Sequence, residues 1–160
     1  MRLPRPDLRR FHHFMAFGFG SGLAPRAPGT FGTVAAIPVY FAFTTLPFWA
    51  YLTLTVLAFG AGVFWCGRAA RELGVHDHPG IVWDEIVGYL LTMAWVPYSV
   101  NAVLAGFLLF RFFDIVKPFP IKWLDEHVEG GFGIMIDDIV AALYAGGVLY
   151  WISGRVAEWR

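Results

Sequence analysis

From residue 83 to residue 117 the chain reads WDEIVGYLLTMAWVPYSVNAVLAGFLLFRFFDIVK. Residues 86–110 within it contain no Asp, Glu, Lys, Arg or His. Proline cannot continue a helical hydrogen-bond ladder and restrains the residue before it, so we expect Pro97 to divide the stretch into two helices, 83–96 and 100–116. These helices form a hairpin, which brings the charged residues at both ends of the stretch to the same side of the fold.

Two further stretches without charged residues or histidine are 27–67 and 139–154. The first is too long for one helix, because ~20 apolar residues already span a bilayer, and Pro47 divides it. The helices expected here are 32–46, 48–73 and 134–153. The segments between helices are rich in Gly, Pro and His, and we expect them to be connections: 16–30, 74–82 and 117–133.

The composition is more apolar and less charged than that of a typical soluble domain, at 58% hydrophobic and 15% charged residues. A net charge of zero argues against a nucleic-acid partner. Cys66 is the only cysteine, which excludes an internal disulfide and a cysteine zinc site. No strand-like alternation of useful length occurs. We therefore expect one all-α domain, residues 1–160, folded as an integral membrane helical bundle with about 4–5 membrane-inserted helices and no sheet.

The orientation in the membrane follows from the basic residues. Four arginines, at positions 2, 5, 9 and 10, precede the first apolar stretch and favour a cytoplasmic N-terminus. Two crossings then return the chain to the cytoplasm before Asp84, and the hairpin returns it again before Asp114. Five crossings leave Arg155 and Arg160 outside, which opposes the positive-inside rule, so we expect some short helices to insert without crossing.

Five acids lie at the ends of the apolar segments, on the side predicted to be cytoplasmic: Asp84, Glu85, Asp114, Asp137 and Asp138. Each taken singly could be a helix cap, a solvated acid or part of a salt bridge. Together they would repel one another, and a divalent cation would neutralise them. Mg²⁺ takes oxygen ligands from carboxylates and from substrate phosphates. We therefore expect all five acids to converge on one Mg²⁺ site.

Positive charge accompanies the acids at the end of the hairpin. Arg111, Asp114 and Lys117 are spaced by three residues and share one helix face. One interpretation is a salt-bridged ridge at the membrane edge, with a lysine that extends to water. The other makes Asp114 a metal ligand and gives Arg111 and Lys117 contacts with a phosphate.

A glycine-rich segment precedes the first long apolar helix and reads GFGSGLAPRAPGTFGT over residues 18–33. Alone it favours a flexible turn followed by a threonine helix cap. Beside a metal and an acid cluster, its backbone N–H groups and hydroxyls could instead bind the phosphate oxygens that the metal leaves free. The expected phosphate-binding residues of this segment are Ser21, Gly29, Thr30, Gly32 and Thr33.

Several motifs occur in a characteristic order: Gly-Phe-Gly-Ser-Gly-Leu, Ala-Pro-Gly-Thr-x-Gly, His-Asp-x-x-x-Ile-Val-x-Asp-Glu, Phe-Arg-x-x-Asp-x-x-Lys-Pro-x-Pro-Ile and Gly-Gly-x-Gly-Ile-Met-x-Asp-Asp. They extend from about Gly18 to Asp138, and the chain resembles the phosphatidylglycerophosphatase A family. The resemblance implies a Mg²⁺-dependent phosphatase of the bacterial inner membrane, with its active site facing the cytoplasm. Such an enzyme hydrolyses phosphatidylglycerol phosphate to phosphatidylglycerol and phosphate. The residues expected to carry catalysis are Asp84, Asp114, Lys117 and Asp138.

Two other classes of function remain open at this point. An ion or metal transporter also carries carboxylates within a membrane, but it more often places them near the midplane and shows paired half-sequences. Here the acids lie at segment ends and no internal repeat is visible. A lipid-binding scaffold without activity is the second alternative. An assay of phosphate release from phosphatidylglycerol phosphate distinguishes the phosphatase from the transporter and from the lipid-binding scaffold.

Overall fold

The computed structural model of the chain describes residues 4–75 and 78–155, which form helices and contain no strand. The elements in order are α1 (Phe11–Ala16), the 3-10 helix η1 (Gly18–Leu23), α2 (Pro28–Phe43), α3 (Phe48–Leu73), α4 (Trp83–Met93), α5 (Val100–Val116), α6 (Ile121–His127) and α7 (Gly130–Arg155). The prediction of an all-α fold without a sheet is therefore confirmed for the described residues.

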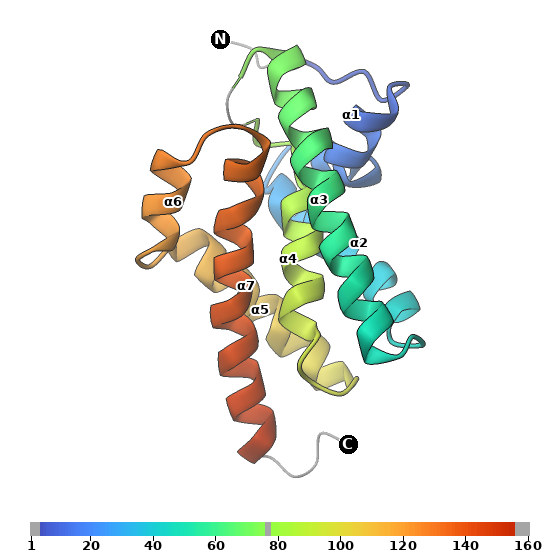
Figure 1. Ribbon diagram of the computed structural model, residues 1–160, viewed down its shortest axis with the longest axis vertical. Coiled ribbons are helices and arrows are strands. Elements are labelled where there is room, and N and C mark those ends of the chain that lie inside the picture. The colour runs from blue at the N-terminus through green and yellow to red at the C-terminus, as the bar shows by residue number, and fades with distance from the viewer. Residues whose placement is uncertain (1–3, 76–77, 156–160) are drawn as a thin grey trace.

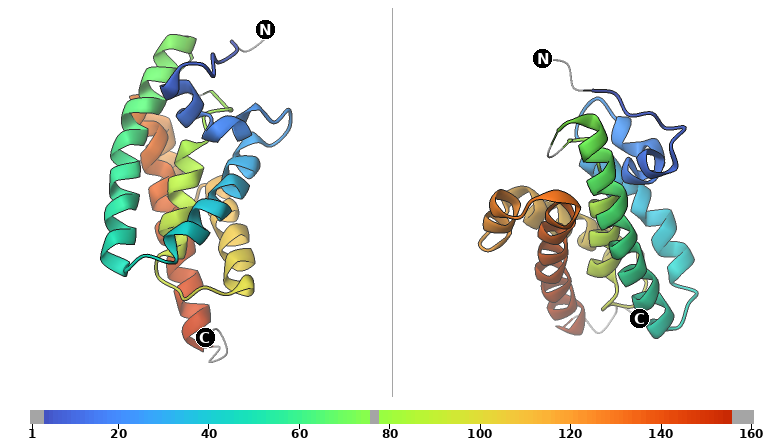
Figure 2. Two further views of the ribbon diagram at one scale, coloured as in Figure 1. Left: turned by 90° about the vertical axis from the view of Figure 1, so that its right-hand side faces the viewer. Right: turned by 45° about the horizontal axis from the view of Figure 1, so that its top comes forward.

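Helix α7 is the central element of the bundle. It packs against α3, α4 and α5, and α3, α4 and α7 run along the long axis of the molecule (Figure 1). Helix α3 runs toward the end that carries α1, whereas α4 and α7 run away from it. Helix α6 lies at the side of the bundle against the first part of α7, as Figure 1 and the right-hand view of Figure 2 show. The beginnings of α4 and α7 thus lie toward the same end as the end of α5.

Two helices begin and end where the sequence predicts. Helix α3 begins directly after Pro47 and ends at Gly74, whose left-handed backbone (φ 66°) is typical of a helix C-terminus. Helix α5 begins after Ser99, whose hydroxyl accepts a hydrogen bond of 3.0 Å from the backbone N–H of Ala102. This side chain satisfies one of the N–H groups that a helix start leaves unpaired.

Other boundaries differ from the predicted ones. Helix α2 begins at Pro28 rather than at residue 32, because proline is well tolerated in the first turn of a helix. Helix α4 ends at Met93 rather than at residue 96, and α7 begins at Gly130 rather than at residue 134. The segments 16–30 and 117–133, expected to be connections, contain η1 and α6. Six- and seven-residue helices are too short to show a period in the sequence.

Two helices in the described part of the chain are long and apolar enough to span a membrane, α3 and the stretch Gly130–Gly154 of α7. The predicted number of about 4–5 inserted helices is not confirmed, because α4 has 11 residues and a length of ~16 Å, well short of a ~30 Å hydrocarbon core. The surface nevertheless presents large apolar side chains: Trp49, Leu57 and Leu108 are 62–72% exposed. Such a surface is typical of helices that face lipid.

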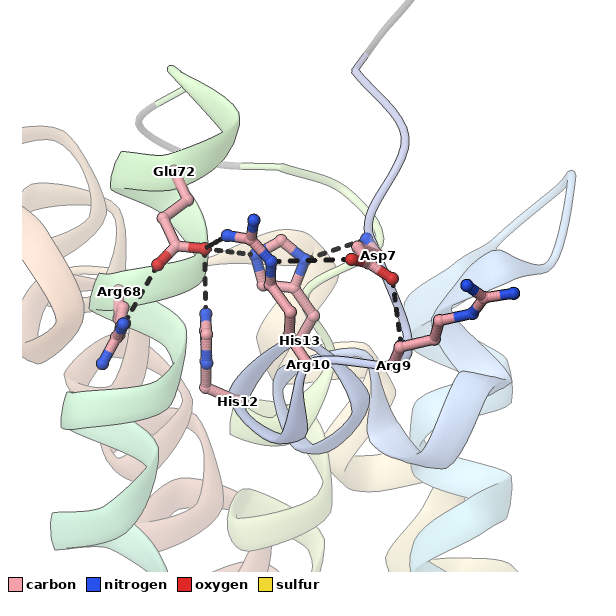
Figure 3. Close-up of polar contacts among 7 residues, drawn as sticks. All are labelled: Asp7, Arg9, Arg10, His12, His13, Arg68 and Glu72. Atoms are coloured by element: carbon pink, nitrogen blue, oxygen red, sulfur yellow. Dashed lines mark hydrogen bonds and ion pairs between the residues drawn. The ribbon is translucent and has the colours of Figure 1, made fainter.

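A cluster of charged residues fastens α1 to the end of α3 (Figure 3). The Glu72 carboxylate accepts hydrogen bonds from Arg10 Nη1 at 2.6 Å and from Arg68 Nε at 3.0 Å, and His12 Nε2 lies 3.0 Å from it. Beyond this cluster, the carbonyl of Ala16 accepts a 2.9 Å hydrogen bond from the N–H of Val82, directly before α4. The N-terminal segment therefore braces the point where α4 begins.

His12, His13 and Glu72 bring their ligand atoms within 4.8 Å of one another, but the hydrogen bonds argue against a metal site. The Nδ1 atom of His13 accepts a hydrogen bond from the N–H of Asp7 at 3.0 Å, so the proton of the neutral ring is on Nε2, which faces Glu72 at 3.3 Å. Burial and the neighbouring His12 lower the pKa of His13, which keeps this ring neutral. A protonated Nε2 cannot bind a metal.

The crossing of α3 and α7 depends on two glycines. A Cβ at Gly131 would overlap the backbone carbonyl oxygen of Val63 and lie 2.9 Å from the Cα of Gly67. Small residues at such a crossing let two helix backbones touch, which increases their van der Waals contact.

We expect Gly131→Ala to destabilise the protein by about 1–3 kcal/mol or more, because the added methyl group forces α3 and α7 apart. The matched control is Gly147→Ala on the same helix, where a Cβ meets no atom within 4 Å. This control should be neutral or stabilising by up to ~1 kcal/mol, because alanine favours a helix. Thermal unfolding in detergent micelles measures the stability of both variants. Equal unfolding midpoints for the two variants would contradict the close contact of Gly131 with α3.

Candidate active site

A cavity of about 300 Å³ lies where α4 and α7 approach the end of α5. All five predicted acids line it, together with one lysine and one further acid: Asp84, Glu85, Asp114, Asp137, Asp138, Lys117 and Asp125. Pro79, Ile81, Val128, Gly133 and Ile134 complete the lining. The structure therefore brings together charged side chains that are up to 54 positions apart in the sequence, from Asp84 to Asp138.

Three of the acids face one another closely. Asp84, Glu85 and Asp138 each offer a carboxylate oxygen within 4.8 Å of the other two. Asp84 Oδ1, Glu85 Oε2 and Asp138 Oδ2 are also buried and have no hydrogen-bond partner within the described residues. A buried carboxylate without a partner is costly, so these oxygens indicate a missing positive ligand. A hard divalent cation such as Mg²⁺ fits this all-oxygen donor set.

The other two acids are paired with cations. Arg111 forms an ion pair with Asp114 one turn later, and its Nη1 atom lies 3.7 Å from Glu85 Oε1. The Oδ2 atom of Asp137 accepts a hydrogen bond of 2.6 Å from Lys117 Nζ. The structure thus distinguishes three acids that face one another, of which Glu85 also lies near Arg111, from two acids in close contact with a cation. The sequence did not make this distinction. Metal binding by Asp114 and Asp137 stays a prediction.

The position of Asp137 and Asp138 within α7 also differs from the expected one. We placed both in the first turn of a helix beginning near residue 134, where the helix dipole favours acids. Because α7 begins at Gly130, its first turn contains no acid, and both residues lie about two turns inside. The helix dipole therefore contributes little to stabilising the charge of these two carboxylates. Their ionised form depends instead on the cations that face them.

Lys117 has an unusual backbone. It follows the last residue of α5 with φ of 45°, the left-handed region, which costs a side-chain-bearing residue ~1–2 kcal/mol. Its Nζ atom reaches both Asp137, at 2.6 Å, and Asp125, at 2.8 Å. Burial lowers the pKa of Lys117, but the two carboxylates raise it by more, so the pKa lies above its ordinary value and the ammonium stays charged.

Sequence reasoning missed Asp125, because segment 117–133 was expected to be a connection. The one available signal was the pair of acids, Asp125 and Glu126, between two site motifs. That pair does not reveal which acid faces the cavity. In the structure Asp125 does so, whereas Glu126 lies on the exposed side, 3.8 Å from Lys122.

The glycine-rich segment packs on the same end of the bundle as the acids. A Cβ at Gly29 would overlap Glu85 Oε1 and lie 3.1 Å from Arg111 Nη1, and a Cβ at Gly32 would lie 2.6 Å from Cβ of Val82. The hydroxyl of Thr33 donates to the carbonyl of Gly29 at 3.0 Å. None of the five predicted phosphate-binding residues of this segment is part of the cavity lining: Ser21, Gly29, Thr30, Gly32 and Thr33.

The histidines before α4 supply no ligand that the structure describes. His76 and Asp77 lie outside the described residues. The ring of His78 lies 3.1 Å from the carbonyl of Pro4 through Nε2, and its Nδ1 accepts a hydrogen bond of 3.0 Å from the N–H of Gly80. Both nitrogens of His78 therefore contact backbone groups, one near the N-terminus and one directly before α4.

Comparison with known proteins shows the family of the chain. The family model described as Phosphatidylglycerophosphatase A matches residues 14–153. The chain belongs to the phosphatidylglycerophosphatase A family. The Phosphatidylglycerophosphatase A of Escherichia coli (strain K12) is 48% identical over 142 residues, which cover 88% of this chain and 83% of that protein. That of Haemophilus influenzae is 49% identical over 143 residues, which cover 88% of each chain. No solved structure matches the chain.

Membership of this family confirms the resemblance seen in the motifs and identifies the chain as a phosphatase. It does not favour the alternative of an ion transporter. The match begins before the glycine-rich segment and continues past Asp138, so the whole cavity lies within the matched region.

We expect Gly29→Ala to lower phosphatase activity on the order of tenfold or more, because the added Cβ displaces Glu85 and Arg111, and small displacements at a reacting centre are costly. The measurement is phosphate release from phosphatidylglycerol phosphate, with thermal unfolding as a check on the fold. Gly60→Ala on α3, where a Cβ meets no atom within 4 Å, is the matched control and should keep normal turnover. Normal turnover of Gly29→Ala would show that this contact does not position the site.

Proposed function

We propose that the chain hydrolyses the terminal phosphomonoester of phosphatidylglycerol phosphate, giving phosphatidylglycerol and inorganic phosphate, in the acid-lined cavity. The observation that carries this proposal is the set of three facing, buried and unpartnered carboxylate oxygens on Asp84, Glu85 and Asp138. Two cationic side chains, Arg111 and Lys117, accompany them. This combination of acids and cations is suited to bind a divalent cation and a phosphate together. The choice of phosphatidylglycerol phosphate as the substrate rests on the names of the relatives.

In this proposal Asp84, Glu85 and Asp138 hold Mg²⁺, which when bound polarises the phosphoryl group. Arg111 and Lys117 neutralise charge that develops on the phosphoryl oxygens. Asp114 and Asp137 hold these two cations in position through the ion pairs described above. We assign phosphate binding to the cations rather than to the glycine-rich segment, because Lys117 lines the cavity and Arg111 contacts two acids that line it, Glu85 and Asp114.

Hydrolysis also requires proton transfer. The oxygen of the attacking water must lose a proton, and the glycerol oxygen that leaves phosphorus must gain one. Among the residues that line the cavity, the bases are carboxylates, since Lys117 is charged. In this proposal a lining carboxylate therefore accepts the proton of the water and returns it to the leaving group.

We further propose that the protein is a multi-pass protein of the bacterial inner membrane, with the cavity facing the cytoplasm. Helices α3 and α7 would cross the bilayer, and the shorter α2, α4 and α5 would insert beside them. The exposed apolar side chains of α3 and α5 support this arrangement. Arg10 and Arg68 lie at the end toward which α3 runs, where the positive-inside rule favours the cytoplasm.

We expect purified protein in detergent micelles to release phosphate from phosphatidylglycerol phosphate with Mg²⁺ and to lose this activity when the metal is chelated. Asp138→Asn should lower turnover on the order of a hundredfold or more, because it removes a charged oxygen from the three facing acids. Glu129→Gln, which changes an exposed acid outside the cavity, is the matched control. Turnover without divalent metal, or full activity of Asp138→Asn, would overturn the assignment.

We expect Lys117→Ala to lower turnover on the order of 10²–10³-fold, because it removes a charged donor from the phosphoryl oxygens. Its unfolding temperature should stay close to that of the unmodified protein. The chain contains one other lysine, Lys122, which is exposed, so Lys122→Ala is the matched control. If Lys117→Ala retained full turnover, the lysine would serve only as a salt-bridge partner at the membrane edge.

A further inference from the structure

Helix α6 contributes one charged group to the cavity, and the proposed mechanism has not yet used it. Asp125 lines the cavity and places its Oδ1 atom 2.8 Å from Lys117 Nζ. The neighbouring Glu126 lies on the outer side of the helix beside Lys122. Because α6 packs against the first part of α7 (Figures 1 and 2), the position of Asp125 is fixed relative to Asp137.

The geometry around Lys117 Nζ limits what the ammonium can do. A lysine ammonium has three N–H groups. Asp137 on α7 accepts at 2.6 Å, and Asp125 on α6 lies at 2.8 Å from the same nitrogen. Two carboxylates from different helices thus use two of the three N–H groups and set the direction of the third. That third N–H remains for a ligand in the cavity.

One carboxylate alone would not fix the direction of the third N–H group of Lys117. A lysine has a flexible four-carbon stem, and a single ion pair leaves the ammonium free to rotate about the contact. With Asp137 alone, the ammonium would be held from the α7 side only. Asp125 supplies the second fixed point, so that Lys117 Nζ is held from both α6 and α7.

We propose that Asp125 is a positioning residue, which acts through Lys117 by holding its ammonium in front of the phosphoryl oxygens. The proposal rests on the proposed phosphatase function. Asp125 is itself negative and would repel a phosphate, so its contribution to the reaction lies in the alignment of Lys117 rather than in contact with the substrate. Loss of its charge should therefore lower kcat without raising KM.

The first test is spectroscopic and does not depend on activity. The chain has two lysines, so protein labelled with ¹⁵N-lysine gives two side-chain ammonium signals, from Lys117 and Lys122. Asp125→Asn should shift the Lys117 signal or broaden it through faster hydrogen exchange, and should leave the Lys122 signal in place. Glu126→Gln is the matched control and should change Lys122 only. An unchanged Lys117 signal in Asp125→Asn would show that Asp125 does not hold the Lys117 ammonium.

The second test is kinetic, with phosphatidylglycerol phosphate as substrate. Asp125→Asn should lower kcat on the order of tenfold to a hundredfold, with KM equal or lower, and Asp125→Glu should restore part of the loss. In a Lys117→Ala background, Asp125→Asn should have no further effect, because the two residues act as one unit. Glu126→Gln should keep the unmodified kcat.

The outcomes separate this inference from the function on which it rests. If the unmodified protein is active and Asp125→Asn behaves like Glu126→Gln, the positioning role is wrong and the phosphatase proposal stands. Additive losses in the double variant would also overturn it, because Asp125 would then act independently of Lys117. If Asp125→Asn shifts the Lys117 signal but the unmodified protein releases no phosphate, the contact between Asp125 and Lys117 is supported and the phosphatase function is rejected.

Discussion

Desolvation of carboxylates is the constraint on which the rest of this structure depends. An ionised carboxylate costs several kcal/mol to bury even after the surroundings relax, and neighbouring acids add their repulsion. The bundle gathers five predicted acids and Asp125 around one cavity. Two cations compensate for part of this charge, because Arg111 pairs with Asp114, and Lys117 contacts both Asp137 and Asp125. Of the three acids that face one another, Glu85 has only the longer 3.7 Å contact with Arg111, and Asp84 and Asp138 have no ion pair within the described residues, so the proposed divalent cation would compensate for the remaining charge.

Small residues make this convergence possible. Gly67 and Gly131 let α3 and α7 touch, Gly62 leaves room for Trp83 and Met135, and Gly88 leaves room for Phe110 between α4 and α5. Lipid gives no hydrophobic driving force for association between helices, so close van der Waals packing of this kind must supply it. The same packing sets the distances between acids on different helices. The stability of the bundle and the geometry of the site therefore depend on the same contacts.

The sequence predicted the parts of this fold that depend on local signals. Helices 48–73 and 100–116 were found because prolines delimit long apolar stretches, and the convergence of the acids followed from counting helices. The sequence could not predict which acids face one another and which are paired, because that depends on contacts between helices. Asp125 was missed for the same reason. Because α7 begins at Gly130, Asp137 and Asp138 lie beyond its first turn.

The glycine-rich segment shows how a sequence pattern that suggests anion binding can have a packing role. Gly18, in the left-handed region, lies against Val82, Gly22 lies against the carbonyl of Gly80, and Gly29 lies against Glu85. Each contact is with the chain just before or at the start of α4, where Asp84 and Glu85 begin the site. The Glu72 cluster holds α1 on α3. The hydrogen bond from the N–H of Val82 to the carbonyl of Ala16 then links α1 to the residue directly before α4. A segment that packs against the start of α4 needs close approach of backbones, and glycine provides it; phosphate binding by this segment stays a prediction.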